Sequence, residues 1–201
     1  MADAHQAIKD VPLPRRMLGI RRDKRGYPIP YLMMDTQIHI DMEKQAECML
    51  KRLCMICGKR LDNKKWFIGG HAAAKNRLFS DLAMHEECAR YSLRVCPFLS
   101  NSDMKYRKKY DDDTIFYAGH IPGTAKERSP TQMLMRTNGY RMCRWRDMLY
   151  VLANRWDYVE HWSYGKQVEG AEHMSAQGLL EQVGLFDEDM GMYYNQLEFL
   201  R

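Results

Sequence analysis

The chain of 201 residues lacks any apolar run near the length of about 20 residues that a membrane-spanning helix needs. Its beginning, from Met1 to Lys9, has no apolar core of the kind that a secretory signal peptide carries. Internal repeats, low-complexity tracts, phosphate-cradling glycine loops, nucleophile elbows and dinucleotide-binding fingerprints are also missing. We therefore expect a cytoplasmic protein with no membrane partner, and no common enzyme signature indicates an activity.

Cysteine is scarce but patterned, with six in the chain. In the cytoplasm, cysteines more often bind metal or stay free than form disulfides. Two spaced pairs of soft ligands occur in Cys54-Met-Ile-Cys57-Gly58 and His85-Glu-Glu-Cys88. A C-x-x-C turn directs both sulfurs inward and a following glycine relieves it, while residues at i and i+3 share one face of a helix. Cys54, Cys57, His85 and Cys88 therefore predict a tetrahedral zinc site.

Four protein ligands would close the coordination sphere, so the zinc is predicted to be structural rather than catalytic. Cys96 lies near enough in sequence to be an alternative to His85 as fourth ligand, although a buried structural thiol is the interpretation that we favour. Cys48 and Cys143 have no partner at metal-binding spacing and are predicted core residues.

The residues around the cysteines predict a helix and a hairpin. Asp41 is a suitable cap for a helix running to about Leu53. Its expected apolar stripe comprises Met42, Ala46, Met49, Leu50 and Leu53. Residues 59–68 predict a β-hairpin that turns near Asp62, because aromatic and β-branched side chains gather in its second arm. A second helix is expected to begin near Ser80 or Asp81 and to end before Pro97. The C-x-x-C turn, the hairpin and the helix that carries the second ligand pair follow one another in the order that is typical of a treble-clef zinc module.

The second half of the chain predicts antiparallel strands followed by helices. Asn138-Gly139 favours a type I′ turn joining strands over 132–137 and 140–146. A further strand pair is expected to flank Tyr164-Gly165, and two helices over 172–183 and 187–200 to close the chain. The fold class is therefore α+β, with a treble-clef-like zinc module packed against a small antiparallel sheet and C-terminal helices. The expected divisions are a basic extended arm over 1–40, the zinc module over 41–99, and hairpins and closing helices over 100–201, with the last two forming one unit.

Charge is distributed unevenly along the chain. The segment from Lys51 to Arg77 contains eight basic residues and a single acid, Asp62. The segment from Val168 to Arg201 contains seven acids and one arginine. The prolines of the first 30 residues, interleaved with arginines, predict an extended arm. A basic half of the chain is typical of proteins that bind nucleic acid. It also fits a solvated surface whose positive charge is balanced by the acidic tail. The predicted phosphate contacts are Arg21, Arg22, Lys64, Lys65, Lys75 and Arg77.

Several motifs together resemble an uncharacterised family of small proteins found in bacteria, particularly actinobacteria, and in their phages. They are Arg25-Gly-Tyr-Pro-Ile-Pro30, Cys54-Met-Ile-Cys-Gly58, Phe67-Ile-Gly69 and His85-Glu-Glu-Cys-Ala89 running to Cys96-Pro-Phe-Leu99, with a weaker match at Trp162-Ser-Tyr-Gly165. The resemblance spans most of the chain in the same order. It implies a phage or mobile-element origin and brings no activity with it.

Three functions follow as hypotheses. The first is a non-enzymatic zinc protein that binds nucleic acid through its basic arm and hairpin. The second is a protein-interaction factor, an inhibitor or adaptor of a host complex. The third and weakest is an HNH-type nuclease, with His71 as general base near Asn76. His120 is interpreted as a loop residue. The late aromatic residues, interleaved with arginines, fit a core better than a stacking surface for single strands.

Overall fold

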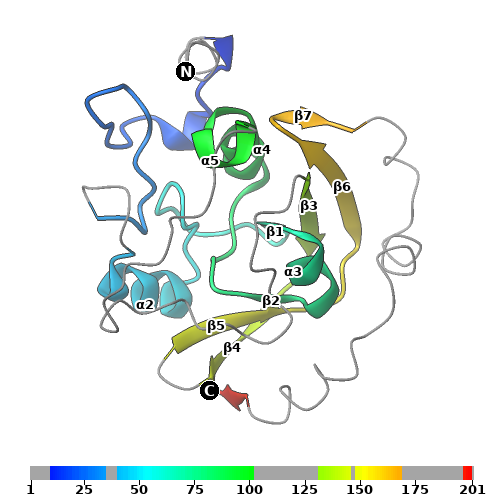
Figure 1. The fold of residues 1–201 in the computed structure, drawn as a ribbon. Coiled ribbons are helices and arrows are strands. Elements are labelled where there is room, and N and C mark those ends of the chain that lie inside the picture. Colours follow the sequence, from blue (N-terminus) through cyan, green and yellow to red (C-terminus); the bar gives the residue numbers. More distant parts are fainter. Residues whose placement is uncertain (1–9, 35–39, 102–130, 146–147, 169–196, 201) are drawn as a thin grey trace, which may run out of the picture.

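Two antiparallel sheets form the centre of the structure (Figure 1). The structure is a computed structural model and describes residues 10–34, 40–101, 131–145, 148–168 and 197–200. The first sheet has the order β1-β3-β6-β7 and the second the order β2-β5-β4-β8. Helices accompany both sheets, so the mixed α+β class is confirmed.

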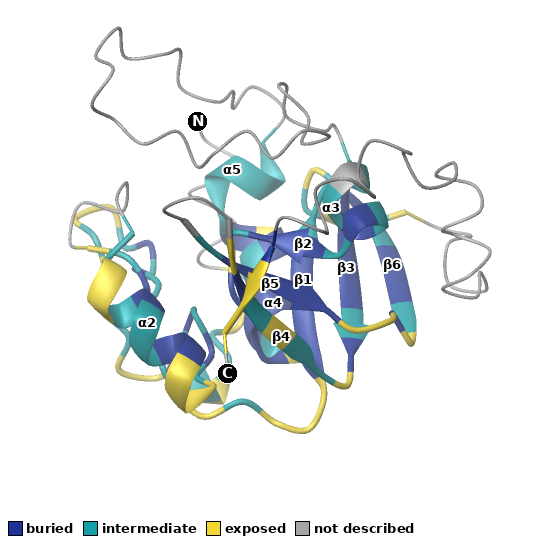
Figure 2. Ribbon diagram, turned by 90° about the horizontal axis from the view of Figure 1, so that it is seen from below, coloured by how far each residue is buried: buried dark blue, intermediate teal, exposed yellow. Residues whose placement is uncertain are grey.

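The first sheet is buried on both of its faces. Its strands are β1 (Lys65–Gly69), β3 (Thr131–Thr137), β6 (Tyr158–Ser163) and β7 (Lys166–Gln167). Alternate residues of β1 point in opposite directions, so Phe67 joins one hydrophobic cluster while Trp66 and Ile68 join the other. Burial on both faces explains the nearly continuous apolar run in β1. Figure 2 shows these strands mostly in the buried colour.

The second sheet covers one of these two clusters. It consists of β2 (Leu78–Phe79), β5 (Met148–Ala153), β4 (Tyr140–Trp145) and β8 (Glu198–Phe199). Phe79 and Val151 lie in the cluster around Phe67, which we call the inner cluster, together with Met133 and Met135 of β3.

The other cluster, which we call the zinc-side cluster, lies between the first sheet and α4 (Glu86–Val95). It contains Cys54 and Cys88 beside Trp66, Leu134 and Trp162. The short η1 turn (Arg15–Met17) and α5 (Pro97–Ser100) complete this layer. Tyr27 and Ile29 of the N-terminal arm are buried, so the arm packs on the core.

Helix α2 (Met42–Lys51) begins as expected at Asp41, whose carboxylate accepts from the backbone N–H groups of Glu43 and Lys44. Its expected apolar stripe is wrong in part. The buried side chains are Gln45, Cys48 and Met49, whereas Met42 and Leu50 are 50% and 74% exposed. The buried positions follow an i, i+3, i+4 pattern that points the helix at the inner cluster. Met42 at the first position of the helix and Leu50 near its end stay exposed to solvent.

The expected hairpin over 59–68 is wrong. The residues after the C-x-x-C turn pair back with those before it, through an isolated bridge between Leu53 and Arg60. Strand β1 pairs instead with β3, and Trp66 also bridges Met84. The expected helix start near Ser80 is wrong for the same reason, because extended pairing of Met84 with Trp66 holds the chain until α4 begins at Glu86.

The turn at Asn138-Gly139 does not close a hairpin. Strands β3 and β4 both form, but they belong to different sheets, and neither Asn138 nor Gly139 has the positive φ of a type I′ turn. The expected strand pair at Tyr164-Gly165 is confirmed, with φ of 45° and 80° at its two turn residues. Helix α3 (His71–Asn76) and strand β5 were not expected from the sequence.

The predicted closing helices lie outside the described residues except at their end. There the helix expected to reach Leu200 is wrong, because Glu198 and Phe199 form β8 beside β4. Among the described residues, no helix has both the length and the apolar character that crossing a membrane requires.

Candidate metal centre

The four predicted ligands meet in one place. The ligand atoms of Cys54, Cys57, His85 and Cys88 all lie within 4.8 Å of one another. Cys54 and Cys88 are fully buried, His85 is buried, and Cys57 is partly exposed. Three sulfurs and one imidazole nitrogen at this spacing form a tetrahedral donor set of the kind that holds zinc.

The first pair sits on a turn that we call the zinc knuckle, residues 53–60. The N–H of Cys54 donates to the carbonyl of Lys59 at 2.8 Å, and the N–H of Gly58 donates to the carbonyl of Cys54 at 2.9 Å. Gly58 has φ of +70°, a left-handed conformation that favours glycine. This backbone brings both cysteine side chains to the same side of the turn.

The second pair is placed by the beginning of α4. His85 is the extended residue that precedes the helix, and Cys88 lies in its first turn. The imidazole Nε2–H donates to the carbonyl of Arg60 at 2.9 Å, which fixes the tautomer and leaves Nδ1 toward the sulfurs, 3.4 Å from Sγ of Cys57. An N–H bonded to a carbonyl behind the ring is the usual support of a metal-bound histidine. Arg60 thus links the knuckle to the second pair through its backbone.

The pKa shifts of the cluster are consistent with a site that holds a cation. Hydrogen bonds from the thiols of Cys54 and Cys88 outweigh burial and hold the pKa of Cys57 well below its usual range. Cys54 and Cys57 raise the pKa of Cys88, because the cluster cannot carry several thiolates without an opposing charge. Burial lowers the pKa of His85, but hydrogen bonds to Cys54 and Cys57 outweigh it and raise the pKa to about 10. A divalent ion would supply the missing positive charge, so the residues fit zinc.

The remaining cysteines lie outside the cluster. Cys96 caps the far end of α4, which places it about 12 Å along the helix axis from Cys88. It therefore does not replace His85. Cys48 and Cys143 are fully buried, in agreement with the prediction that they are core residues.

Arg16, in the η1 turn, ties the N-terminal arm to the metal site. Its guanidinium contacts the carboxylate of Asp62 at 3.0 Å and that of Glu87 at 2.8 Å. Asp62 follows the knuckle and Glu87 lies between the ligands of α4, so one side chain bridges both ligand segments. No sequence pattern indicates this role, because the three residues are far apart in the chain.

The residues that are predicted to contact phosphates lie in several different elements of the structure. Arg21 and Arg22 in the arm donate to the backbone carbonyls of Met33 and Gly26. Lys64 forms an ion pair with Asp157. Lys65, at the beginning of β1, is 9% exposed and donates to the carbonyl of Asn63. Lys75 and Arg77 lie half-buried at the end of α3.

A different set of cations is exposed on the zinc knuckle and at the residue just before it. Arg52, Lys59 and Arg60 are exposed, and none of them belongs to an ion pair of the described residues. Lys59 also lines an open hollow of about 580 Å³ with Arg15, Arg16 and Glu87. The knuckle and the residue before it therefore present three exposed cations.

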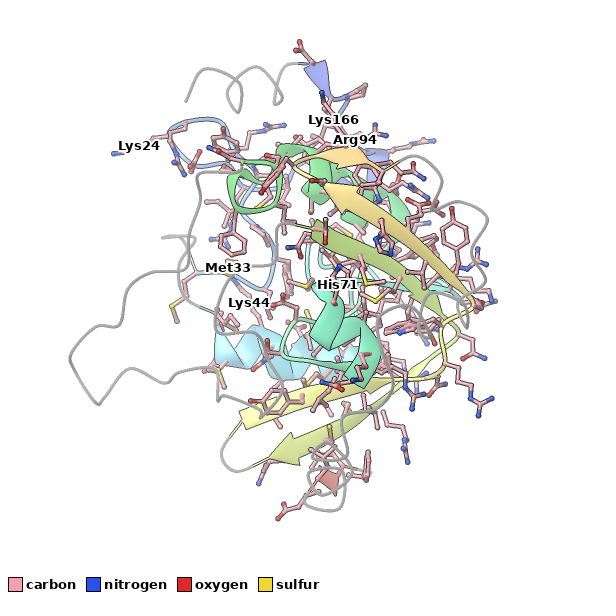
Figure 3. The ribbon with its side chains drawn as sticks, turned by 45° about the vertical axis from the view of Figure 1, so that its right-hand side comes forward. Lys24, Met33, Lys44, His71, Arg94 and Lys166 are labelled. Carbon is pink, nitrogen blue, oxygen red and sulfur yellow. The ribbon has the colours of Figure 1, made fainter. Side chains whose placement is uncertain are left out.

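His71 lies across the first sheet from the zinc cluster. It begins α3, and Figure 3 shows it beside the strands of this sheet. Asn76 is buried at the other end of α3. His120 lies outside the described residues. Trp156, Trp162 and Tyr150 are buried, which confirms the interpretation of these late aromatic residues as core.

Comparison of the chain with family models, curated proteins and solved structures gives no match. The resemblance to the actinobacterial and phage family thus stays a prediction, and the geometry of the site itself must carry its interpretation.

Proposed function

We propose that the protein is a non-enzymatic, treble-clef-like zinc module of phage or mobile-element origin that binds nucleic acid through its zinc knuckle. The observation that carries the proposal is the group of exposed cations Arg52, Lys59 and Arg60, which have no acidic partner among the described residues. Cations free of internal ion pairs are available to neutralise phosphates and to release counterions.

The electrostatic surroundings of the knuckle support this proposal. Burial and, to a smaller extent, the positive charge of Arg52 lower the pKa of Lys65. The negative charge of Asp62 weakly raises it. Positive charges therefore lie close enough to one another to interact unfavourably in the free protein. A polyanion placed against them would relieve this repulsion.

The metal organises this surface. The bridge between Leu53 and Arg60 fixes the backbone of one of the cations, and the carbonyl of Lys59 accepts from the N–H of Cys54. The carbonyl of Arg60 also holds His85. Contacts of this kind position a nucleic acid without reading its sequence. Binding should therefore depend on zinc and show little sequence preference.

Fluorescence anisotropy with labelled DNA and RNA oligomers, measured over a series of salt concentrations, tests the proposal. In a triple variant of Arg52, Lys59 and Arg60 to alanine, we expect affinity at low salt to fall at least tenfold and the salt slope to shrink by about two to three. The matched control replaces Lys44, Lys51 and Lys64 by alanine. It removes the same charge, but each of these lysines has an acidic partner in the structure.

We expect the control variant to retain most of the affinity. Equal losses in both triple variants would mean that only net charge matters, and the knuckle would lose its assigned role. No binding at low salt would reject nucleic acid as the partner.

The second candidate function is that of a protein-interaction factor acting on a host complex. Exposure of Met42 and Leu50 on one side of α2 favours it, because large apolar side chains on a helix commonly contact another protein. It predicts a partner that binds the native protein and the knuckle triple variant equally well, and that is lost when Met42 and Leu50 become lysine. Retention of the partner by that variant would exclude the α2 face.

A further inference from the structure

Two histidines from distant parts of the chain meet on the inner-cluster side of the first sheet. His71 begins α3 and His161 lies in β6, where it pairs with Met133 of β3. Their ring centroids are 5.6 Å apart and the ring planes are perpendicular. Neither residue is needed for the zinc cluster, which lies on the opposite face of the sheet.

His161 has a nitrogen without a partner. Its Nε2 atom is buried and makes no hydrogen bond within the described part of the chain. A buried polar atom without a partner is unfavourable, so its presence calls for an explanation. Burial, followed by the proximity of His71, lowers the pKa of His161 and so favours the neutral imidazole, in which one ring nitrogen has a lone pair.

The ring of His71 is held at one of its nitrogens. Its Nε2 lies 2.8 Å from Oγ1 of Thr131, the first residue of β3. With Nε2–H donating to this hydroxyl, Nδ1 carries the lone pair. The arrangement parallels that at His85, where one ring nitrogen is bonded to the protein and the other faces the metal cluster.

The ring separation matches that of two imidazoles on one ion. Metal–nitrogen distances of about 2.0–2.1 Å and a tetrahedral or wider angle place two ring centroids roughly 5–5.5 Å apart. The observed 5.6 Å lies just above this range, so small side-chain movements would complete the geometry.

We propose that His71 and His161 form a second metal site, open to solvent ligands, that binds a divalent transition ion such as Zn²⁺, Ni²⁺ or Co²⁺. Neutral imidazoles suit these ions, whereas Mg²⁺ and Ca²⁺ require oxygen ligands. Two protein ligands leave the other coordination positions to water, so the ion exchanges readily, in contrast to the closed Cys3His cluster. The inference does not depend on nucleic-acid binding.

Calorimetric titration of the zinc-loaded full chain with Ni²⁺ tests the site. We expect one additional equivalent to bind, and its affinity to fall at least tenfold in His71→Gln and in His161→Gln. The control is His120→Gln, which removes a histidine that the proposal does not use, and its affinity should match that of the native chain. Zinc content measured in parallel shows that the Cys3His cluster stays intact in every variant.

A spectroscopic measurement on the native chain covers the case in which a variant fails to fold. Co²⁺ bound by imidazole and water lacks the intense near-ultraviolet charge-transfer bands that thiolate ligands give, and its proton spectrum should show shifted ring signals from two histidines. Absence of the additional equivalent, a loss in only one of the two histidine variants, or equal losses in His120→Gln would overturn the proposal. The two rings would then simply pack edge to face.

Discussion

Glu160 is a charged residue in an almost dry position. It is 1% exposed, and both of its oxygens accept from the guanidinium of Arg90, at 2.9 and 2.6 Å. The hydroxyl of Tyr158 and the Nε1–H of Trp162 donate to the same carboxylate. Arg90 lies in α4 and Glu160 in β6, so this ion pair fastens the ligand-bearing helix to the first sheet. A buried carboxylate with four donors is costly to disturb because removal of one partner leaves the other uncompensated.

Replacement of Glu160 by glutamine should lower the free energy of unfolding at pH 7 by about 3 kcal/mol. Burial raises the pKa of Glu160, but the hydrogen bonds from Arg90, Tyr158 and Trp162 outweigh it and leave the pKa lowered. A carboxylate with a lowered folded pKa stabilises the protein above its unfolded pKa of about 4.3, and this contribution disappears as pH falls toward the folded pKa. The deficit of the variant should therefore shrink below about pH 4.5.

The matched control for this experiment is Glu86→Gln, which removes the exposed partner of the same arginine. It should cost less than about 1 kcal/mol, because solvent screens an exposed pair. Chemical denaturation at several pH values measures both variants. A pH-independent deficit in the Glu160 variant would contradict the linkage argument.

Cys57 is the most accessible ligand of the zinc cluster, and its replacement tests the site directly. In Cys57→Ser, bound zinc should drop from about one equivalent toward zero after dialysis, because a neutral hydroxyl is a poor substitute for a thiolate. Cys96→Ser is the control, since Cys96 caps the far end of α4. It should keep its zinc. Metal analysis of both purified variants decides the matter, and unchanged zinc in Cys57→Ser would remove the residue from the ligand set.

At the scale of elements, the zinc knuckle depends on one glycine for two reasons. Gly58 has φ of +70°, and a Cβ placed on it would lie 2.7 Å from the ring of Tyr31. That ring cannot move freely, because the Tyr31 hydroxyl donates to Glu47 at 2.5 Å and its N–H donates to the carbonyl of Ile56 at 2.9 Å. The turn therefore requires both the conformational freedom and the small size of glycine.

Gly58→Ala should lower the free energy of unfolding by about 2–4 kcal/mol, of which the left-handed conformation accounts for about 1–2 and the clash with Tyr31 for the rest. Gly19→Ala separates the two effects. Gly19 has φ of +81° and open space around its Cβ position, so only the conformational cost applies. Thermal unfolding of both variants compares them. Equal destabilisation would show that the Tyr31 ring yields without cost.

The elements also show how far local sequence patterns reach. The zinc ligands could be predicted because each pair is held by one turn or one helix start, and such spacing is visible in the chain. The strand pair that flanks Tyr164-Gly165 could be predicted because a glycine stands between strand-forming residues. The pairing of β1 with β3 could not be found, because residues 65–69 and 131–137 meet only through tertiary packing. His71 and His161 meet for the same reason.

Two predictions from local sequence patterns are wrong because tertiary packing opposes the local preference. Asn138-Gly139 has the sequence of a hairpin turn, yet the two strands that it joins enter different sheets. Burial of both strands among the large apolar side chains of the inner cluster outweighs the small preference of a turn. The predicted apolar stripe of α2 is wrong in part because hydropathy alone does not show which side of a helix contacts the core.

At the scale of the whole molecule, the zinc cluster is part of the core rather than an appendage. Cys54 and Cys88 belong to the same buried cluster as Met17 and Tyr27 of the arm and Leu134 and Trp162 of the first sheet. The other face of that sheet carries the inner cluster. Structural changes at the metal should therefore spread through the sheet to the whole protein.

Removal of zinc by a chelator should destabilise the entire described fold in one step. A ligand that binds only the folded state at a thousandfold excess over its dissociation constant adds about 4 kcal/mol, and loss of this term should shift the midpoint of thermal unfolding markedly downward. Because the sheet between the two clusters is shared, far-ultraviolet circular dichroism and tryptophan fluorescence should report the same transition, and added zinc should restore it. An unchanged midpoint would contradict a structural role for the metal. Separate transitions for the two signals would show instead that the zinc side unfolds independently of the inner cluster.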